Sequence, residues 1–347
     1  MEIQPCPVAD TCGGCPMMSL PAAAQESQRR DALTRSVRRP PDQTISSPRT
    51  LGYRARILLR PGADGRLGYH QSRSNAHLPI ARCPIARDEI NDVLSVLGPV
   101  PPALAGVELR SDGERVVLSA TSRRRHGRRR GHRKSGTIDR SALLAATSEA
   151  PLAGVALDGE TLAGDPRVIL SAGGITHQLK PLTFYQVNLE VNAWLVDTVR
   201  ALAMECSPSR VLDLYAGAGN LSLPLAAAGI PVTQLEQAPS SVSDARATAK
   251  RLGLEVDIRQ GDAGAFKAGD AFFEVAILDP PRSGARGVID ELIVTRPLRI
   301  IYISCNPGTL SRDIRPALHA GYTLSRLDFL DMFPQTHHAE ALCVLDR

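Results

Sequence analysis

The chain has 347 residues, with 41 lysines and arginines against 36 aspartates and glutamates, so its net charge is +5. Hydrophobic residues make up 43% of it, which excludes a wholly disordered protein, and the length allows two or three domains. No apolar run is long enough to span a bilayer and no secretory signal is visible at the start, so we expect a cytoplasmic protein without membrane contact.

The charge is divided unevenly along the chain. Residues 1–134 hold 23 basic and 12 acidic side chains, whereas residues 135–347 hold 18 and 24. Such a split indicates that the first part meets a polyanion and the second does something else. Eight of the basic residues lie in a run without acids, 123–134, which either clamps a nucleic-acid backbone or is a solvated loop.

Four of the seven cysteines are grouped in the way metal ligands are. Three form the compact motif Cys6-x5-Cys12-Gly-Gly-Cys15, and Cys83 follows at a distance, just before a proline. In a cytoplasmic protein, thiols at such spacing more often bind metal than form disulfides. One triplet with a distant partner favours an iron–sulfur cluster over the paired knuckles of structural zinc. Zinc and free thiols remain the alternatives.

Strand-like pieces are predicted in the middle of the chain, at Tyr53–Leu59, Arg66–His70, Gly106–Arg110 and Arg115–Ala120. From about residue 179 onward, short apolar strands alternate with helices such as Ser240–Leu252. These strands are predicted at Arg210–Tyr215, Pro231–Glu236, Glu255–Arg259, Glu274–Leu278, Arg299–Ser304, Tyr322–Phe329 and Glu340–Asp346. The alternation is typical of a doubly wound α/β sheet, which binds ligands at the carboxyl ends of its strands.

We therefore divide the chain into three parts. Residues 1–90 are assigned to the cysteine cluster and the start of a small domain. Residues 91–178 are assigned to a central α+β domain that carries the basic run. Residues 179–347 are assigned to the doubly wound α/β domain.

A glycine loop follows the first strand of the last domain and contains Asp213, Tyr215, Gly217, Gly219 and Asn220. Glycines let a backbone turn sharply and approach a ligand closely. The dinucleotide fingerprint needs a third glycine, where serine stands here, so the sequence does not favour NAD. The string instead resembles the Asp/Glu-x-x-x-Gly-x-Gly loop of class I S-adenosylmethionine (SAM) methyltransferases.

Further acids lie where such a fold uses them. Glu236 ends the second strand, where a carboxylate can accept both ribose hydroxyls. Asp262 follows the third strand and can meet an adenine amino group, and Asp279 ends the fourth. Singly, each would be an ordinary solvated acid. Together with Asp213, they place four acids at successive strand ends behind a glycine loop, which favours a ligand site.

Cys305 ends the fifth strand, at the edge where the ligand crevice opens. Most free cysteines are small buried hydrophobes, and we assign that role to Cys206 and Cys343. Cys305 differs because it is followed by Asn-Pro and an Arg-Asp pair. A thiolate is the reactive form, so we expect a nearby cation or dipole to lower the pKa of this thiol.

Four strings together resemble the RNA 5-methyluridine methyltransferase family: Phe184–Asn188, Leu278–Ala285, Ser304–Asp313 and Asp331–Glu340. Order and spacing agree across about 160 residues, and the glycine loop matches as well. The resemblance implies a Rossmann-like class I methyltransferase sheet, preceded by a smaller α+β domain with an iron–sulfur loop. It also implies SAM-dependent methylation of carbon 5 of uracil in RNA.

The resemblance further implies residue roles. Cys305 would be the nucleophile that adds to carbon 6, and Glu340 the base that removes the carbon 5 proton. Family members often carry a [4Fe–4S] cluster, which Cys6, Cys12, Cys15 and Cys83 would hold. The residues around SAM would be Gln186, Asp213, Tyr215, Gly217, Gly219, Asn220, Glu236, Asp262 and Asp279.

Some positions depart from the family pattern. Ala216 stands where the loop usually has cysteine, and Ala339 where valine usually precedes the base, but neither change removes a reacting atom. Amino methylation of adenine or cytosine is the competing methyltransferase reaction. Its Asp/Asn-Pro-Pro motif ends in an aromatic residue that stacks on a flipped base, whereas Arg282 stands here.

The family's larger members have a small OB-fold barrel before the cluster, and this chain begins almost at Cys6. By analogy with shorter members, we expect 23S rRNA as substrate and a monomeric enzyme, with RNA meeting the basic first half. A tRNA uridine-54 methyltransferase is the first alternative. A catalytically idle iron–sulfur RNA-binding protein is the second, and intact Cys305 and Glu340 argue against it.

Overall fold

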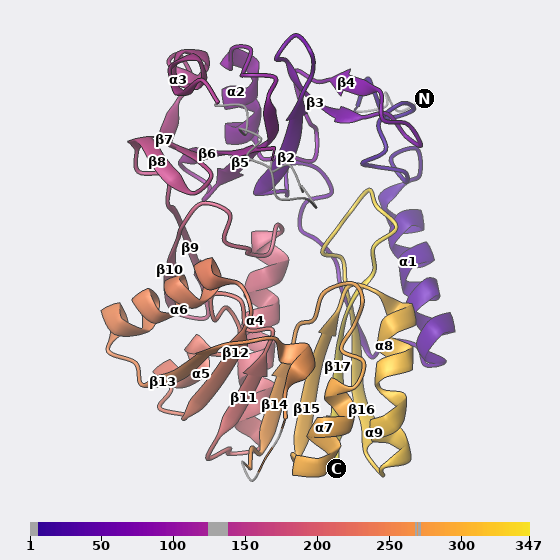
Figure 1. Ribbon diagram of the computed structural model, residues 1–347. Coiled ribbons are helices and arrows are strands. Elements are labelled where there is room, and N and C mark those ends of the chain that lie inside the picture. Colours follow the sequence, from indigo (N-terminus) through magenta and orange to yellow (C-terminus); the bar gives the residue numbers. More distant parts are fainter. Residues whose placement is uncertain (1–5, 124–137, 268, 270–271) are drawn as a thin grey trace, which may run out of the picture. The chain divides into compact units, whose positions relative to one another are not determined.

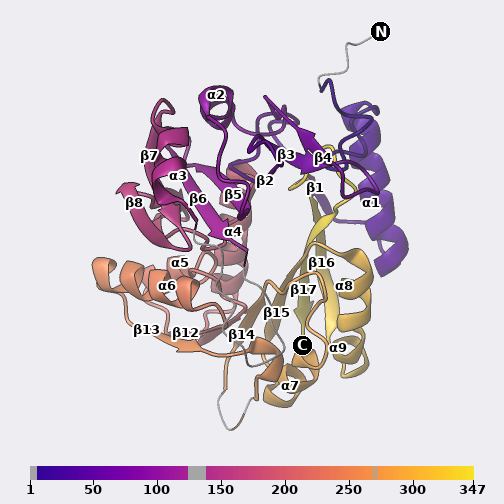
Figure 2. The same ribbon diagram turned by 45° about the horizontal axis from the view of Figure 1, so that its top comes forward.

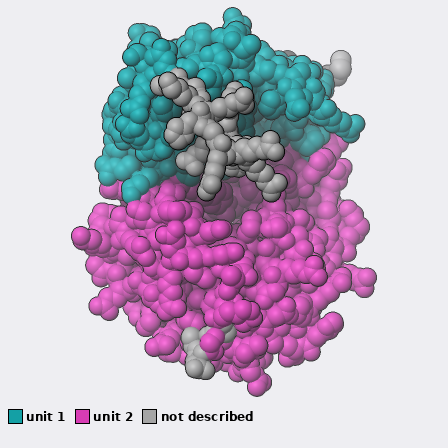
Figure 3. Space-filling view, in the orientation of Figure 1, with its two compact units in different colours: residues 1–19, 49–169, 179–182 teal, residues 20–48, 170–178, 183–347 magenta. Residues whose placement is uncertain are grey.

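The computed structural model describes residues 6–123, 138–267, 269 and 272–347. Its contacts divide the chain into two compact units (Figure 3). Unit 1 comprises residues 1–19, 49–169 and 179–182, and unit 2 comprises residues 20–48, 170–178 and 183–347. Nearly all of the basic run lies outside the described residues. Every helix in the described ranges is too short or too polar to span a bilayer.

Unit 1 is built on a seven-stranded sheet whose order is β4-β3-β2-β5-β6-β7-β8. Its neighbours pair antiparallel except β6 and β7. The strands are β2 (Arg56–Pro61), β3 (Leu67–His70), β4 (His77–Pro79), β5 (Leu104–Ser111), β6 (Val116–Ser122), β7 (Leu152–Leu157) and β8 (Glu160–Gly164). Helices α2 (Asp88–Val96) and α3 (Arg140–Thr147) complete the unit, and its core contains Cys6 and Cys83.

Unit 2 contains an eight-stranded sheet, with the order β1-β16-β17-β15-β14-β11-β12-β13 (Figure 1). All neighbours pair parallel except β17, which runs antiparallel to β15 and β16. The strands are β1 (Gln43–Ile45), β11 (Val211–Leu214), β12 (Val232–Glu236), β13 (Val256–Gln260), β14 (Val275–Leu278), β15 (Arg299–Ser304), β16 (Thr323–Leu330) and β17 (Glu340–Asp346). The predicted Rossmann-like sheet is therefore confirmed.

Both faces of this sheet are covered by helices, so its central strands are apolar on both sides. Successive side chains of a strand point to opposite faces of the sheet. Ile301 packs in the core with α4 (Leu189–Glu205), whereas its neighbours Ile300 and Tyr302 pack with α7 (Val288–Thr295) and α8 (Pro307–Asp313). The helices are α1 (Ala22–Val37), α4 (Leu189–Glu205), α5 (Leu223–Ala227), α6 (Pro239–Leu252), α7 (Val288–Thr295), α8 (Pro307–Asp313) and α9 (Arg315–His319). A hairpin of β9 (Val168–Ala172) and β10 (Ile175–Leu179) precedes α4.

Residues 20–48 lie in unit 2, whereas the sequence predicts them to belong with the cysteines in residues 1–90. Helix α1 places Leu33 in the core on the α7 and α8 face of the sheet. Strand β1 then extends the sheet by pairing with β16, as Figure 2 shows at the edge of the sheet. The edge strand β1 of the doubly wound sheet thus comes from a segment that precedes the strands of unit 1 in the chain.

Candidate active site

The glycine loop connects β11 to α5 and uses left-handed backbone conformations. Gly217 has φ +57° and open space where a Cβ would stand. Gly219 has φ +85°, and a Cβ there would lie 2.6 Å from Leu223 and 2.8 Å from the amide nitrogen of Gln234. Gly219 therefore serves packing, whereas Gly217 leaves room for a ligand beside the backbone. Tyr215 also has positive φ, at +62°.

Two acids brace this loop. The buried Asp213 carboxylate accepts a 2.5 Å hydrogen bond from the hydroxyl of Ser222, the residue that replaces the third fingerprint glycine. Burial raises the pKa of Asp213 to about 7, and the charges of Asp279 and Glu236 add to the effect. Glu236, at the end of β12, accepts the Gly217 N–H at 2.9 Å. The carboxylate predicted to meet the ribose thus also fixes the loop.

The remaining residues predicted around SAM belong to the same unit, Gln186 before α4, Asn220 in the glycine loop, and Asp262 and Asp279 after their strands. Gln186 donates a 3.2 Å hydrogen bond to the Asp279 carboxylate. Asn220 pairs side chain to side chain with Asn192 of α4, at 2.7 Å. Asp262 is exposed and caps the short helix Ala263–Ala265. The glycine loop, Gln186 and Asp279 therefore lie close together. Asp262 follows β13, the edge strand of the sheet.

Cys305 and Glu340 lie at the ends of adjacent strands. Ser304 of β15 pairs with Ala341 of β17 in antiparallel register, so the next residues along, Cys305 and Glu340, face each other across the strand ends. Cys305 is half-buried, whereas Glu340 is only 2% exposed. Four ionisable groups interact here, since Asp279 and Arg282 influence the charge of both residues.

The electrostatics of this group correct one prediction. Burial, together with the carboxylates of Glu340 and Asp279, raises the pKa of Cys305 to about 11, although Arg282 opposes them. The expected cation is Arg282, which does lower this pKa, but burial and the two carboxylates outweigh it, so the net shift in the chain by itself is upward. Burial, followed by the Asp279 charge, also raises the pKa of Glu340 well above its usual range. Each group therefore keeps its proton to a higher pH than it would in water.

Sequence reasoning gave no role to Arg282 beyond excluding amino methylation. Its guanidinium donates to the His338 ring at 2.6 Å, and the Arg282 carbonyl accepts from Asn306 at 3.4 Å. It is the cationic group that opposes the pKa rise of both Cys305 and Glu340. The available signal was its position three residues after Asp279, in a loop that starts at the same strand edge as Cys305.

The four predicted cluster cysteines lie together in unit 1. Cys6 and Cys83 are buried, and Cys12 and Cys15 are half-buried. Burial, together with the other three thiols, raises the pKa of the Cys15 thiol to about 12. Within the described ranges, no three Cys, His, Asp or Glu side chains have the arrangement of a metal site. The four thiols are thus close enough to influence one another's charge.

Cys83 is held by groups other than thiols. Its N–H donates to the Asn91 side chain of α2 at 2.8 Å, and the Asn91 amide donates back to the Cys83 carbonyl at 3.1 Å. The Tyr69 hydroxyl donates to the Cys83 sulfur at 3.8 Å. Hydrogen bonds of this kind orient the ligands in metal sites.

Comparison with known proteins decides the family. Residues 266–347 match the family model described as tRNA (Uracil-5-)-methyltransferase. The chain is 33% identical over 367 residues to the 23S rRNA (uracil(1939)-C(5))-methyltransferase RlmD of Klebsiella pneumoniae (strain 342), covering 99% of this chain and 81% of that one. The chain belongs to the RNA uracil-C5 methyltransferase family. It is a SAM-dependent enzyme of that family.

Other relatives and a solved structure agree with this assignment. The enzyme is 32% identical to RlmD of Pseudomonas putida over 99% of this chain and 79% of the relative. It shares its fold with the tRNA (uracil-54, C5)-methyltransferase of Pyrococcus abyssi, solved in complex with S-adenosyl-L-homocysteine. That match has a TM-score of 0.77 at 21% identity and covers 96% of this chain and 86% of the other.

Proposed function

We propose that this enzyme methylates carbon 5 of a uridine in 23S rRNA, with Cys305 as nucleophile and Glu340 as base. The observation that carries the proposal is the register of β15 and β17, which sets a thiol and a buried carboxyl opposite each other at the ligand edge of the sheet. A uridine lying between them would meet the thiol at carbon 6 and the carboxyl at carbon 5.

Carbon 5 of uracil is a poor nucleophile, and the proposed steps overcome this. The Cys305 thiolate adds to carbon 6, forming a carbon–sulfur bond and shifting the electron pair into an enolate. SAM, when bound, supplies the methyl group that carbon 5 takes up. The Glu340 carboxylate then removes the carbon 5 proton, the electron pair re-forms the 5,6 double bond, and the carbon–sulfur bond breaks to free Cys305.

Thiolate formation at Cys305 depends on its neighbours. Two carboxylates raise its pKa, and the Arg282 guanidinium lowers it. Any cation or proton that neutralises Glu340 or Asp279 therefore favours the thiolate. Arg282 is the group within the chain placed to stabilise negative charge as it develops on the sulfur or on the uracil enolate.

The residues proposed to hold SAM fit a cationic, adenosine-bearing ligand. Gly217 provides a backbone position with open space for close approach, and the acids at the strand ends supply negative charge and acceptors for hydroxyl groups. The full proposed set is Gln186, Asp213, Tyr215, Gly217, Gly219, Asn220, Glu236, Asp262 and Asp279.

We also propose that Cys6, Cys12, Cys15 and Cys83 hold a [4Fe–4S] cluster with a structural role. The mutual influence of the four thiols and the hydrogen bonds to Cys83 support this assignment. A cluster would supply a rigid link between residues 6–15 and residue 83, and the methyl-transfer chemistry does not need its redox activity. Bound zinc is the alternative for the same thiols.

The choice of RNA rests on the relatives. Relatives that are 31–33% identical over nearly the whole chain are named as 23S rRNA enzymes in several species, and this supports rRNA for the present enzyme. The likeness to a tRNA uridine-54 enzyme is structural and more distant. We propose an enzyme that acts on rRNA as a cytoplasmic monomer.

The proposal is tested with purified enzyme, methyl-labelled SAM, and separate 23S rRNA and tRNA transcripts. We expect label in 5-methyluridine of the 23S transcript alone and none with Cys305→Ala. RNA containing 5-fluorouridine should form a covalent adduct that requires both SAM and Cys305, because fluorine cannot leave as a proton does. Label in tRNA alone would establish the tRNA alternative. Binding without label or adduct would establish the idle RNA-binding protein.

A further inference from the structure

Glu340 follows a nine-residue loop, 331–339, that joins β16 to β17. Leu330 and Glu340 pair with each other across the two strands, so both ends of the loop meet at the base. Gln335, in the middle of the loop, has φ +69°, a left-handed conformation that non-glycine residues rarely adopt. Such a conformation persists only where the surroundings hold it.

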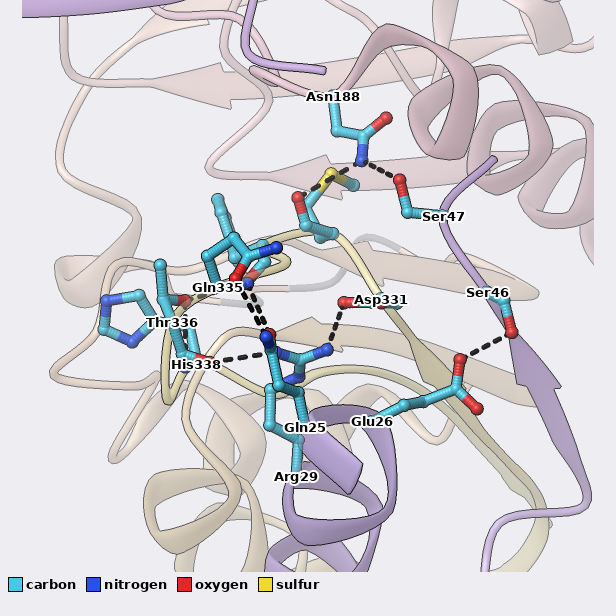
Figure 4. Close-up of polar contacts among 12 residues, drawn as sticks. Gln25, Glu26, Arg29, Ser46, Ser47, Asn188, Asp331, Gln335, Thr336 and His338 are labelled. Carbon is cyan, nitrogen blue, oxygen red and sulfur yellow. Dashed lines mark hydrogen bonds and ion pairs between the residues drawn. The ribbon is translucent and has the colours of Figure 1, made fainter. Parts of the chain in front are cut away.

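Helix α1 supplies the groups that hold this loop (Figure 4). The Gln25 amide donates to the Gln335 side chain at 2.8 Å and accepts the Gln335 N–H at 2.9 Å. One turn later, Arg29 donates to the Thr336 carbonyl at 3.0 Å and forms a 2.7 Å ion pair with Asp331. These two side chains therefore hold the loop at its start and at its middle.

All five residues of this network are 6% exposed or less. Gln25, Arg29 and Leu33 form the buried face of α1, at a spacing of four residues. A helix that only had to pack on the sheet would bury apolar side chains there, because a buried ion pair seldom stabilises a fold more than well-packed hydrophobic residues do. Two buried polar side chains aimed at one loop indicate a positional role instead.

The segment after α1 reinforces the same loop. The Asp331 N–H donates to the Ile45 carbonyl of β1 at 2.8 Å. Asn188 donates to the Ser47 hydroxyl at 2.9 Å and to the Met332 carbonyl at 3.4 Å. Helix α1 and the segment that follows it therefore both contact loop 331–339. Asn188 links the same loop to the start of α4, two residues after the proposed SAM residue Gln186.

We propose that Gln25 and Arg29 are positioning residues that hold loop 331–339 and so keep the Glu340 carboxylate in place to remove the carbon 5 proton. This inference rests on the proposed function. Loss of the positioning would leave Cys305 able to add to carbon 6 and carbon 5 able to take up the methyl group. The step that fails is transfer of the proton to Glu340, without which the carbon–sulfur bond does not break.

The test compares two variants with matched controls on the exposed side of the same helix. Gln25→Leu and Arg29→Met remove the contacts, whereas Gln28→Leu and Arg35→Met make the same changes at exposed positions. Each protein is incubated with 23S rRNA transcript and methyl-labelled SAM. Turnover is measured, and the covalent protein–RNA adduct is measured on denaturing gels.

We expect Gln25→Leu and Arg29→Met to lose about 100-fold in turnover, the effect expected of a small misplacement of a catalytic group. They should also accumulate methylated adduct, as Glu340→Gln should, while both controls match the wild type. If formation of the adduct and turnover fell by the same factor, α1 would only support folding. If turnover did not change, the contacts would be dispensable. Either result overturns the inference.

A conservative change covers the case in which Arg29→Met does not fold. Arg29→Lys keeps a cation for Asp331 but cannot reproduce the forked contact with both Asp331 and Thr336. It should give intermediate turnover with some adduct, and wild-type turnover without adduct would contradict the inference. A wild-type enzyme that makes neither 5-methyluridine nor adduct fails the proposed function itself, and the inference falls with it.

Discussion

At Cys305, opposing charges decide the state of the sulfur. Burial and two carboxylates raise the pKa of the thiol to about 11, and the single guanidinium of Arg282 does not compensate. The chain by itself therefore keeps the proposed nucleophile protonated near neutral pH. Reactivity then depends on neutralising the acids beside it, which ties attack on uracil to the occupants of the site.

The protonation state of Cys305 can be measured from its rate of alkylation with iodoacetamide, followed by peptide-resolved mass spectrometry. At pH 8 we expect a rate about tenfold below that of an exposed thiol, because the thiolate fraction is much smaller while each thiolate is somewhat more nucleophilic. The rate should rise steadily with pH between about 7 and 10.

Glu340→Gln should accelerate the labelling, since it removes a charge that raises the pKa of Cys305. Cys305→Ala identifies the labelled peptide. A rate that does not change with pH between 7 and 9 would mean that the thiolate is already formed, contrary to this description.

Individual residues differ in how far the sequence predicts them. Cys305, Glu340 and Asp279 stand at strand ends that the alternation of apolar segments locates well. The roles of Gln25 and Arg29 could not be predicted, because their partners lie about 300 residues away along the chain. A polar helix face also usually indicates contact with solvent. Long-range polar contacts leave no local pattern.

At the scale of elements, Gly219 of the glycine loop can be compared with Gly229, which lies outside that loop. Gly219 and Gly229 share φ +85°, but a Cβ at Gly219 would collide with Leu223 and Gln234, whereas at Gly229 it would meet nothing within 4 Å. Gly229→Ala should lower the free energy of unfolding by about 1–2 kcal/mol, the cost of a left-handed alanine.

Gly219→Ala should cost about 1–3 kcal/mol more, because the loop must shift to admit the methyl group. It should also weaken binding of S-adenosyl-L-homocysteine, while Gly229→Ala should leave that binding unchanged. Urea unfolding and calorimetric titration measure the two effects. Equal binding by both variants would show that the loop geometry does not shape the SAM site.

The central elements of the sheet were predictable, and its edge was not. Strands β14 and β15 are almost continuous apolar runs between helices, which is the pattern of a parallel sheet buried on both faces. Strand β1 has only three residues and its neighbour α1 buries glutamine and arginine, so neither shows a periodic apolar signal. The sequence therefore does not predict that β1 and α1 belong to unit 2.

At the scale of the whole molecule, Cys6, Cys12, Cys15 and Cys83 belong to unit 1 and the proposed reacting residues to unit 2. A structural cluster should therefore be separable from SAM binding. We expect anaerobically purified protein to contain about four iron atoms per chain. Cys15→Ala should lose them and lower the thermal stability of unit 1, while binding of S-adenosyl-L-homocysteine persists.

Cys206→Ala, at a half-buried cysteine outside this group, is the control and should keep its iron. Metal analysis and absorption spectra give the result. Zinc in place of iron would support the alternative for these thiols, and a Cys15→Ala protein with unchanged iron would contradict the assignment of the ligands.

The charge division along the chain yields a prediction about RNA affinity. Residues 123–134 carry eight basic side chains, and all but the first lie outside the described residues. Deleting them should weaken RNA binding and flatten its dependence on salt, because fewer counterions are released from the phosphates. The preference among RNA sequences should stay the same. An unchanged salt slope, measured by filter binding, would show that the run does not contact RNA.

The central claim is that this enzyme forms 5-methyluridine in 23S rRNA through Cys305. The most direct measurement maps 5-methyluridine in total RNA from cells with the gene, without it, and with the gene restored as wild type or as Cys305→Ala. We predict that one 23S rRNA uridine loses its methyl group in the deletion and regains it only with the wild-type gene. Loss at a tRNA position with rRNA unchanged, or restoration by Cys305→Ala, would contradict the claim.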